Sequence, residues 1–226
     1  MRALLMTPQQ NGWGWWQPWV NTIAYYPLTS TTTTSDMSWN WYNLTNNWMV
    51  FGTYHWVSCA YKGKHYKATA TVTTAPTWNA ARTYSFWCYN ENTTIDSSDI
   101  EWYIVHGNLS TNNMVLIGAS EGGSWKDFIS QRGSWKQFWV SLRGQWVYNC
   151  VVYNGSTFYW YRNWTLLDTW TYTINTTWYS FIIGGNPLNW RDVLAWTFSE
   201  VILENKARTA TEASDYYNNT KSSYWL

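Results

Sequence analysis

Two carboxylates, Asp99 and Glu101, come closest in this sequence to a catalytic arrangement. Side chains two residues apart in a strand share a face. A pair of carboxylates on one face can supply the general acid and the nucleophile for glycoside hydrolysis. Trp102 follows directly and no third acid continues the alternation. We therefore interpret the pair as a solvated strand end and predict no catalytic residues, with a glycan hydrolase as the less favoured alternative.

Histidine and cysteine give no sign of a metal or redox site. The three histidines show neither the spacing of a ligand set nor that of a catalytic relay. Cys59, Cys88 and Cys150 form no CxxC motif, so zinc and thioredoxin chemistry are unsupported. We expect three buried thiols on strands, with a Cys88–Cys150 disulfide as the alternative, and no cofactor.

Calcium has one candidate ligand, Asp36, in the loop Asp-Met-Ser-Trp-Asn. Calcium takes six to eight oxygen ligands, and one carboxylate does not make such a site. We expect Asp36 to accept hydrogen bonds within its own turn, as Asx turns do. Calcium binding stays possible but unsupported.

Aromatic and amide side chains near predicted turns are the candidates for ligand binding. Aromatic rings stack on sugars, and amides bond to sugar hydroxyls. On a sheet face the same residues pack equally well into a core, and both interpretations stay open. The candidates are Asn90, Trp102, Tyr148, Asn154, Tyr159 and Tyr161.

Length and composition indicate a single β domain. A chain of 226 residues suits one large sandwich. Charged residues make up 12% and the net charge is +1, which disfavours nucleic acid as a partner. No apolar run approaches the length of a membrane span. We expect residues 1–21 to form a flexible tail or linker and residues 22–226 to form the sandwich.

Strand and turn signals alternate from Thr22 onward. Runs rich in threonine and aromatic residues predict about twelve short strands, separated by turns rich in asparagine and serine. Thr209–Tyr217 alone has helical character, with Thr209 as N-cap and Glu212 closing a capping box. The predicted strands are 22–28, 57–61, 66–73, 83–89, 100–106, 114–119, 125–130, 137–142, 147–153, 157–162, 178–183 and 194–204.

Tryptophan stands where tight turns normally need glycine. The chain has 22 Trp and only 13 Gly, and Trp follows Asn or Ser in several turn-like dipeptides such as Asn163-Trp164. Glycine adopts positive φ freely, whereas a bulky residue does not. We hypothesise that many of these codons are UGA, read here as Trp although the source reads them as Gly. The alternative is a surface lectin rich in sugar-stacking Trp.

This hypothesis makes a geometric prediction: several of the recoded tryptophans lie at turns, with positive φ or strained neighbours and with exposed rings. In contrast, Trp87 and Trp102 should be genuine and buried or packed on a sheet. The proposed glycine positions are Trp13, Trp15, Trp16, Trp19, Trp39, Trp41, Trp48, Trp56, Trp164, Trp170, Trp190 and Trp196.

The order of motifs resembles laminin-G-like domains of the concanavalin A-like lectin/glucanase group. Tyr161-Arg-Asn-Trp164 resembles the family's "Tyr-x-Asn-Gly" turn between two strands, and residues 194–207 resemble its last strand, "Phe-x-Gly-x-Ile-x-Glu-Val-x-Ile-x-Asn-Arg-Ala". Residues 36–44 resemble "Asp-x-Ser-Gly-Asn-Gly-x-x-Leu", and Thr209–Tyr217 resembles its closing helical turn.

The resemblance implies an all-β fold: a jelly-roll sandwich of two antiparallel sheets with a short C-terminal helix. It further implies a non-catalytic recognition or adhesion module that binds a glycan or a cell-surface partner. Such a module belongs on an extracellular, cell-surface or virion protein, of a phage or a bacterium. A structural spacer domain of a phage tail, fibre or surface protein is the alternative. The glucanases of the group carry "Glu-x-Asp-x-Glu" on one strand, and Asp99-Ile-Glu101 lacks one of its acids.

Overall fold

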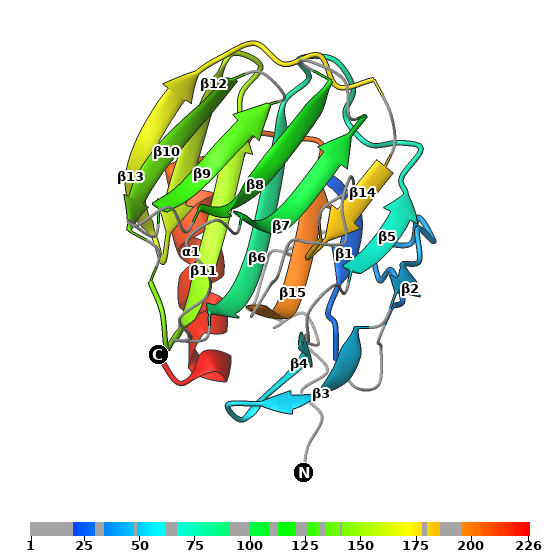
Figure 1. Ribbon diagram of the computed structural model, residues 1–226, viewed down its shortest axis with the longest axis vertical. Coiled ribbons are helices and arrows are strands. Elements are labelled where there is room, and N and C mark those ends of the chain that lie inside the picture. Colours follow the sequence, from blue (N-terminus) through cyan, green and yellow to red (C-terminus); the bar gives the residue numbers. More distant parts are fainter. Residues whose placement is uncertain are drawn as a thin grey trace, which may run out of the picture.

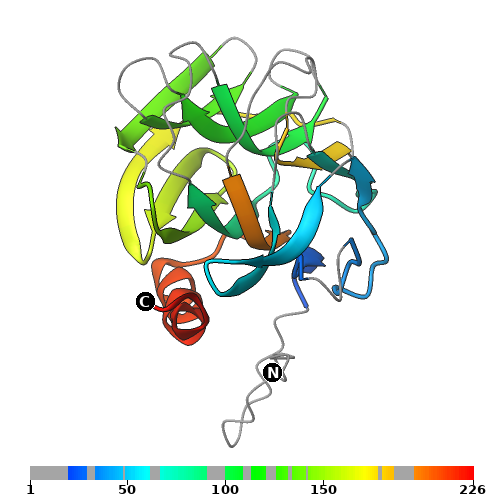
Figure 2. The same ribbon diagram turned by 60° about the horizontal axis from the view of Figure 1, so that its bottom comes forward.

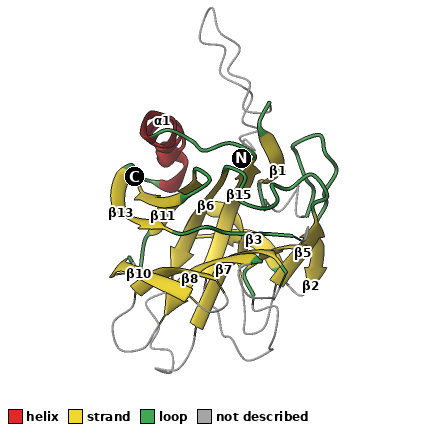
Figure 3. Ribbon diagram, turned by 90° about the horizontal axis from the view of Figure 1, so that it is seen from above, coloured by secondary structure: helices red, strands yellow, loops and turns green. Residues whose placement is uncertain are grey.

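A computed structural model shows two antiparallel sheets packed face to face, with one helix against the outer side of one sheet (Figures 1 and 3). This confirms the predicted all-β sandwich and its short C-terminal helix. The structure describes residues 20–29, 34–47, 49–61, 67–90, 100–108, 113–120, 126–131, 134–140, 142–177, 180–185 and 196–226. The predicted tail, apart from its last two residues, lies outside this part.

Sheet A has the strand order β13-β12-β11-β6-β15-β4-β3, with β1 paired to β15. Its longest strands, β6 and β15, pair along most of their length at the centre of the sheet. The strands are β1 (Thr22–Tyr26), β3 (Val50–Tyr54), β4 (Val57–Tyr61), β6 (Arg82–Asn90), β11 (Trp146–Tyr153), β12 (Thr157–Arg162), β13 (Thr165–Thr171) and β15 (Trp196–Glu204).

Sheet B has the order β10-β9-β8-β7-β14-β5-β2 and lies in front in Figure 1. Strands β7 to β10 pair in sequence order, whereas β14 inserts between β7 and β5, and β5 pairs with the distant strand β2. The strands are β2 (Thr45–Asn47), β5 (Lys67–Thr71), β7 (Ile100–Gly107), β8 (Met114–Ser120), β9 (Lys126–Gln131), β10 (Ser134–Val140) and β14 (Ser180–Ile183).

Both faces of the central strands of sheet A, β6, β11 and β15, are buried, because sheet B covers one face and the C-terminal helices cover the other (Figure 2). On β6, Phe86 and Cys88 point into the core between the sheets, while Trp87 and Tyr89 point outward into a second cluster. Helix α1 (Ala210–Thr220) and the 3-10 helix η1 (Lys221–Tyr224) supply the cover for that second cluster. In the view from above, α1 lies beyond sheet A and opposite sheet B (Figure 3).

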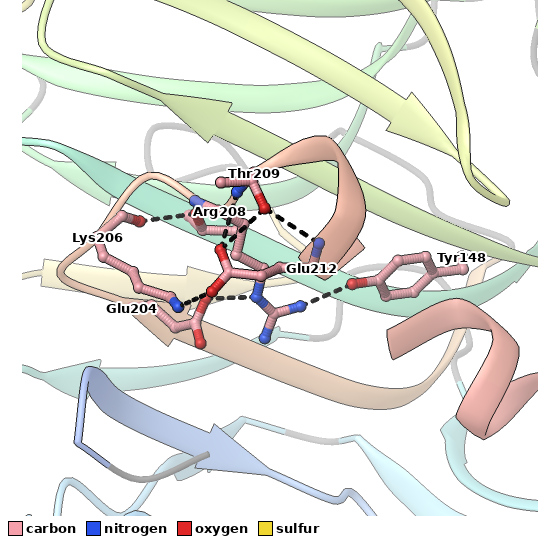
Figure 4. Close-up of polar contacts among 7 residues, drawn as sticks. Tyr148, Glu204, Lys206, Arg208, Thr209 and Glu212 are labelled. Carbon is pink, nitrogen blue, oxygen red and sulfur yellow. Dashed lines mark hydrogen bonds and ion pairs between the residues drawn. The ribbon is translucent and has the colours of Figure 1, made fainter. Parts of the chain in front are cut away.

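Helix α1 begins as the sequence predicts and is fixed by a buried charge network. The side chain of Thr209 accepts from the Glu212 amide, and Glu212 accepts from the Thr209 amide, so the capping box is complete. Before the helix, the Arg208 guanidinium donates to the Glu204 carboxylate at 2.5 Å and to the Tyr148 hydroxyl at 2.8 Å (Figure 4). These contacts attach the start of α1 to strands β15 and β11.

Polar groups also link the two sheets across the interior. The Tyr103 hydroxyl of β7 donates to Asp127 of β9, and Asp127 forms a buried ion pair with Arg162 of β12. At the β10–β13 edges, Lys136 pairs with Asp168 at 2.7 Å. The two ion pairs join sheet B to sheet A and fix their relative position, while the Tyr103 bond holds Asp127 in place within sheet B.

All twelve predicted strands are present, and ten of them have different ends. The spans 57–61 and 157–162 are β4 and β12 without change. Three strands were missed. β2 is very short, β3 contains a glycine, and β13 breaks the polar–apolar alternation with Leu166-Leu167.

The three cysteines are free and buried, as predicted. Cys88 faces the core between the sheets, whereas Cys59 and Cys150 lie in the cluster under the helix. Cys88 and Cys150 are therefore on opposite faces of sheet A, and the alternative of a disulfide between them is wrong.

Tryptophans divide into two groups by backbone conformation. Six have positive φ and exposed rings: Trp39, Trp41, Trp56, Trp78, Trp164 and Trp225. In contrast, Trp87, Trp146 and Trp160 have ordinary φ and are buried, and Trp102 and Trp170 are partly buried. Positive φ and exposure thus occur together, as predicted for Trp39, Trp41, Trp56 and Trp164, and Trp87 and Trp102 pack as predicted.

Two of these sites are two-residue hairpin turns. Asn163 and Trp164 join β12 to β13 with φ of 50° and 113°, and His55 and Trp56 join β3 to β4 with φ of 46° and 68°. Positive φ at both central residues is the mark of a type I′ turn, which favours Asn-Gly.

Four further sites do not behave as the hypothesis expected or were not anticipated. Trp170 and Trp196 lie in strands β13 and β15 without positive φ, so these two positions do not show the turn geometry expected of several of the twelve. Trp78 and Trp225 have the predicted geometry but were not among the twelve. Trp13, Trp15, Trp16, Trp19, Trp48 and Trp190 lie outside the described residues.

Candidate ligand-binding groove

The six predicted ligand residues do not gather at one site. Tyr148 is fully buried beneath α1, and its ring stacks on Tyr216 at 5.4 Å. Tyr161 is also buried in that cluster, with Tyr159 packed against its margin. These tyrosines attach the helix layer, and Tyr148 offers no surface to a ligand.

The other candidates are spread over both sheets. Trp102 lies on the outer face of sheet B, edge-on to Phe128 at 5.4 Å. Asn154 caps the β11–β12 turn by accepting from the Ser156 and Thr157 amides. Asn90 ends β6, and its side chain lies outside the described part. A ligand role for any of them stays a prediction.

A groove with a volume of about 490 Å³ lies at the β2–β5–β14 end of sheet B. This is within the usual range of about 300–1,000 Å³ for sites that bind small molecules. The residues lining it are Trp41, Tyr42, Asn43, Thr45, Thr69, Ala70, Thr71 and Ser180.

Strand register builds the floor of this groove. β5 alternates between buried alanines, Ala68 and Ala70, and outward threonines, Thr69 and Thr71. Ser180 of β14 lies opposite Thr71, and Thr45 of β2 lies opposite Thr69. Because paired residues share a face, all four hydroxyl side chains lie on the outer face of the sheet.

Several polar groups in the groove are available to a ligand. Within the described part of the chain, the hydroxyls of Thr45, Thr71 and Ser180 make no hydrogen bond, while Thr69 accepts weakly from Asn47 at 3.5 Å. Asn43 accepts from the Asp36 amide through Oδ1 at 2.8 Å, which leaves its NH₂ group to donate elsewhere.

The loop that forms the groove wall is held by Asp36. Its carboxylate accepts from the amides of Tyr25, Ser38 and Tyr42 and from the Ser38 hydroxyl, at 2.8–3.0 Å. The bond from the Ser38 amide is the predicted Asx turn. Asp36 is thus a structural acceptor that sets the path of the chain toward Tyr42 and Asn43.

Tyr42 fixes the wall to the end of β5. Its hydroxyl lies 2.9 Å from the Thr73 hydroxyl and donates to the Thr74 hydroxyl at 3.0 Å, and its carbonyl accepts from the Tyr26 hydroxyl. Trp41 stands at the rim, 75% exposed, with a φ of 61°. The groove therefore combines one anchored tyrosine with a floor of hydroxyls.

No charged residue is among the described residues that line the groove. Elsewhere, Asp99 of the carboxylate pair lies outside the described residues, and Glu101 is on β7. No group of three or more His, Cys, Asp or Glu residues suited to a metal ion occurs in the described part of the chain. No described helix is long and apolar enough to cross a membrane.

Comparison of sequences gives no relative: no protein-family model matches the chain, and no curated protein matches it. Comparison of structures, in contrast, finds proteins with a similar fold. The binding domain of botulinum neurotoxin DC, solved with rat synaptotagmin II, has a TM-score of 0.65 at 14% identity, over 88% of this chain and 52% of that one.

Two further structures agree. The serotype D ligand-binding domain, solved with N-acetylneuraminic acid, has a TM-score of 0.67 at 9% identity, over 88% of this chain and 51% of that one. The binding domain of Paraclostridial Mosquitocidal Protein 1 has a TM-score of 0.67 at 14% identity, over 88% and 52%. This chain thus spans about half the length of each, and at such identities the likeness establishes a shared fold.

Proposed function

We propose that this domain is a non-catalytic recognition module that binds a neutral glycan in the groove at the β2–β5–β14 end of sheet B. The observation that carries the proposal is a set of three hydroxyls, Thr45, Thr71 and Ser180, that have no hydrogen-bond partner among the described residues and lie beside Tyr42 on a floor without described charged groups. A sugar ring presents several hydroxyls and an apolar face, and such a floor with one aromatic side chain complements both.

The structural neighbours support a glycan or cell-surface ligand in general and not a neutral one, because N-acetylneuraminic acid carries a carboxylate. One is solved with N-acetylneuraminic acid and one with synaptotagmin II, a glycan and a protein receptor respectively. We extend to this chain the coarser idea they share, a glycan or cell-surface ligand. We also propose the finer assignments: a laminin-G-like member of the concanavalin A-like group, carried on an extracellular, cell-surface or virion protein.

A glycan array followed by calorimetry with the best neutral oligosaccharide tests the proposal. Thr71→Val and Ser180→Ala each remove one hydroxyl, and each should weaken binding about threefold to tenfold, since a net hydrogen bond contributes about 0.5–1.5 kcal/mol. Thr53→Val is the matched control, because Thr53 is an exposed strand threonine on β3 of the other sheet. Retention of full affinity by both groove variants, or the absence of any glycan ligand, would overturn the proposal.

A separate proposal concerns the tryptophans: Trp39, Trp41, Trp56 and Trp164 stand at glycine positions encoded by UGA. Their positive φ and exposed rings support it, and Trp78 and Trp225 extend the set on the same grounds. Sequencing the gene decides the matter, because UGG at most of these codons excludes recoding. The glycan proposal rests on strand hydroxyls and stands without Trp41.

A further inference from the structure

Glu200 is a buried acid between sheet A and the C-terminal helix layer. The register of β15 on β6 shifts between Phe198 and Glu200, so Phe198 and Val201 face the inner core while Glu200 is directed toward the helix side with Ile202. The residue is 4% exposed, its polar neighbours are the hydroxyls of Tyr25 and Tyr216, and among the described residues no cation forms an ion pair with its carboxyl group.

Charge around Glu200 does not balance when it is ionised. Arg208 is the one cation among the described groups that act on it, and Arg208 is already paired with the buried carboxylate of Glu204. The guanidinium also donates to Tyr148 and lies 4.8 Å from the centre of the Tyr216 ring. One guanidinium therefore faces two carboxyl groups, and an uncompensated buried charge is strongly destabilising.

The remaining groups around Glu200 come from every element packed there. They are Tyr25 of β1, Tyr216 of α1 and Tyr224 of η1, with Cys59 of β4 beside Tyr224. Burial raises the pKa of Glu200. The hydroxyls of Tyr216 and Tyr25, and more weakly Arg208, oppose this rise without cancelling it.

We propose that α1 and η1 form a proton-controlled latch on sheet A. The latch is closed while Glu200 carries a proton beneath it, and loss of that proton favours release of the helices from the sheet. The direction follows from linkage: an acid whose pKa is raised by folding stabilises the closed state below its ordinary pKa, and this stabilisation disappears as the pH rises through the raised value. Release uncovers the outer aromatic cluster, including Trp87 and Tyr148.

The free cysteines report on the latch without any added label. Cys59 and Cys150 lie under the helices, and Cys88 lies between the sheets. Burial raises the pKa of the Cys59 thiol to about 12 and that of Cys150 to about 11, so both react slowly while covered. Opening of the latch alone should expose Cys59 and Cys150 and leave Cys88 protected.

The experiment measures thiol alkylation of the native chain by mass spectrometry between pH 5 and 9, in wild type and in Glu200→Gln. Glutamine mimics the protonated acid, and taking the rate ratio at each pH cancels the chemistry of the thiol. The ratio of wild type to variant at Cys150 should be lowest at pH 5, rise by up to tenfold per pH unit above the ordinary glutamate pKa of about 4.3, and level off above the raised pKa of Glu200. Asp215→Asn, which removes an exposed acid from the same helix, should behave as wild type.

Hydrogen exchange of the Ala210–Tyr224 amides in the wild-type chain gives a second readout that needs no variant. After correction for intrinsic rates, protection of the helix should fall with rising pH while that of β6 and β11 persists. The proposal is overturned by a ratio that is independent of pH, by Cys88 reacting in step with Cys150, or by helix protection that does not change with pH.

Discussion

Replacing Trp56 by glycine and, separately, by alanine isolates the backbone cost of its turn. Both substitutions remove the same indole ring, which is 83% exposed, so the loss of ring contacts is common to the two. Only glycine also relieves the left-handed conformation at φ 68°. The comparison between the two variants therefore reports conformation and not packing.

The expected difference follows from two opposing terms. A residue with a Cβ in the left-handed region costs about 1–2 kcal/mol relative to its preferred conformation. Glycine loses about 0.5–1 kcal/mol more conformational entropy on folding than alanine. Trp56→Gly should therefore be about 0.5–1 kcal/mol more stable than Trp56→Ala, or about 1–4 °C in Tm for a domain of this size.

Trp170 provides the matched control, since it lies within β13 and has no positive φ. At Trp170 the difference in stability between the two variants should have the opposite sign, with the alanine variant about 0.5–1 kcal/mol more stable than the glycine variant. Denaturation in urea followed by circular dichroism measures all four variants, and Trp164 can be treated in the same way. Alanine equal to or better than glycine at both Trp56 and Trp164 would refute the assignment of these sites as glycine positions.

Three further predictions concern the helix layer and the core. Thr209→Ala removes the N-cap of α1 and should cost about 1 kcal/mol in urea denaturation; no change would show that the capping box is dispensable. Arg208→Met leaves Glu204 buried without its partner and should lower the free energy of unfolding by about 3–5 kcal/mol. The double variant that also carries Glu204→Leu should recover much of this stability. Equal losses of stability in the single and double variants would contradict the pairing. Burial lowers the pKa of His106, so the stability that comes from its neutral form is present above the ordinary pKa of about 6.5 and is lost as the pH falls. His106→Gln should therefore reduce the fall in Tm between pH 7 and pH 5. An unchanged dependence of Tm on pH in this variant would exclude His106 as the cause.

Local signals in the sequence were enough to place the turns and the helix. Asn163-Trp164 was assigned as a turn because Asn-Gly is the usual pair there, and the backbone adopts positive φ at both residues. The capping box at Thr209 and Glu212 involves four consecutive residues and needs no tertiary information. The sequence does not predict a turn at Trp78 or Trp225, because Thr and Tyr precede them and neither site carries an Asn-Gly-like dipeptide.

The groove, in contrast, could not be derived from local pattern. Thr45 and Ser180 are far apart in sequence and meet only because β5 pairs with β2 on one side and β14 on the other. Likewise, alternation along β11 assigns Tyr148 to the outer face of sheet A but does not tell that a helix from the end of the chain covers that face. Of the two interpretations left open for Tyr148, core packing is the one the structure shows, and the sequence cannot decide between them because a half-buried strand and a fully buried one share the same period.

The two groups of tryptophan change what composition can say about function. A high Trp content favours a lectin only if the rings are held where a sugar can stack on them. Here the exposed rings, at Trp39, Trp56, Trp164 and the other positive-φ sites, occupy turns whose conformation suits glycine, and the remaining described rings of ordinary conformation are buried or packed against neighbours. The tryptophans thus give little support to sugar binding. The hydroxyls of Thr71 and Ser180 carry that proposal instead, because their position follows from strand register and would be unchanged if every exposed tryptophan were glycine.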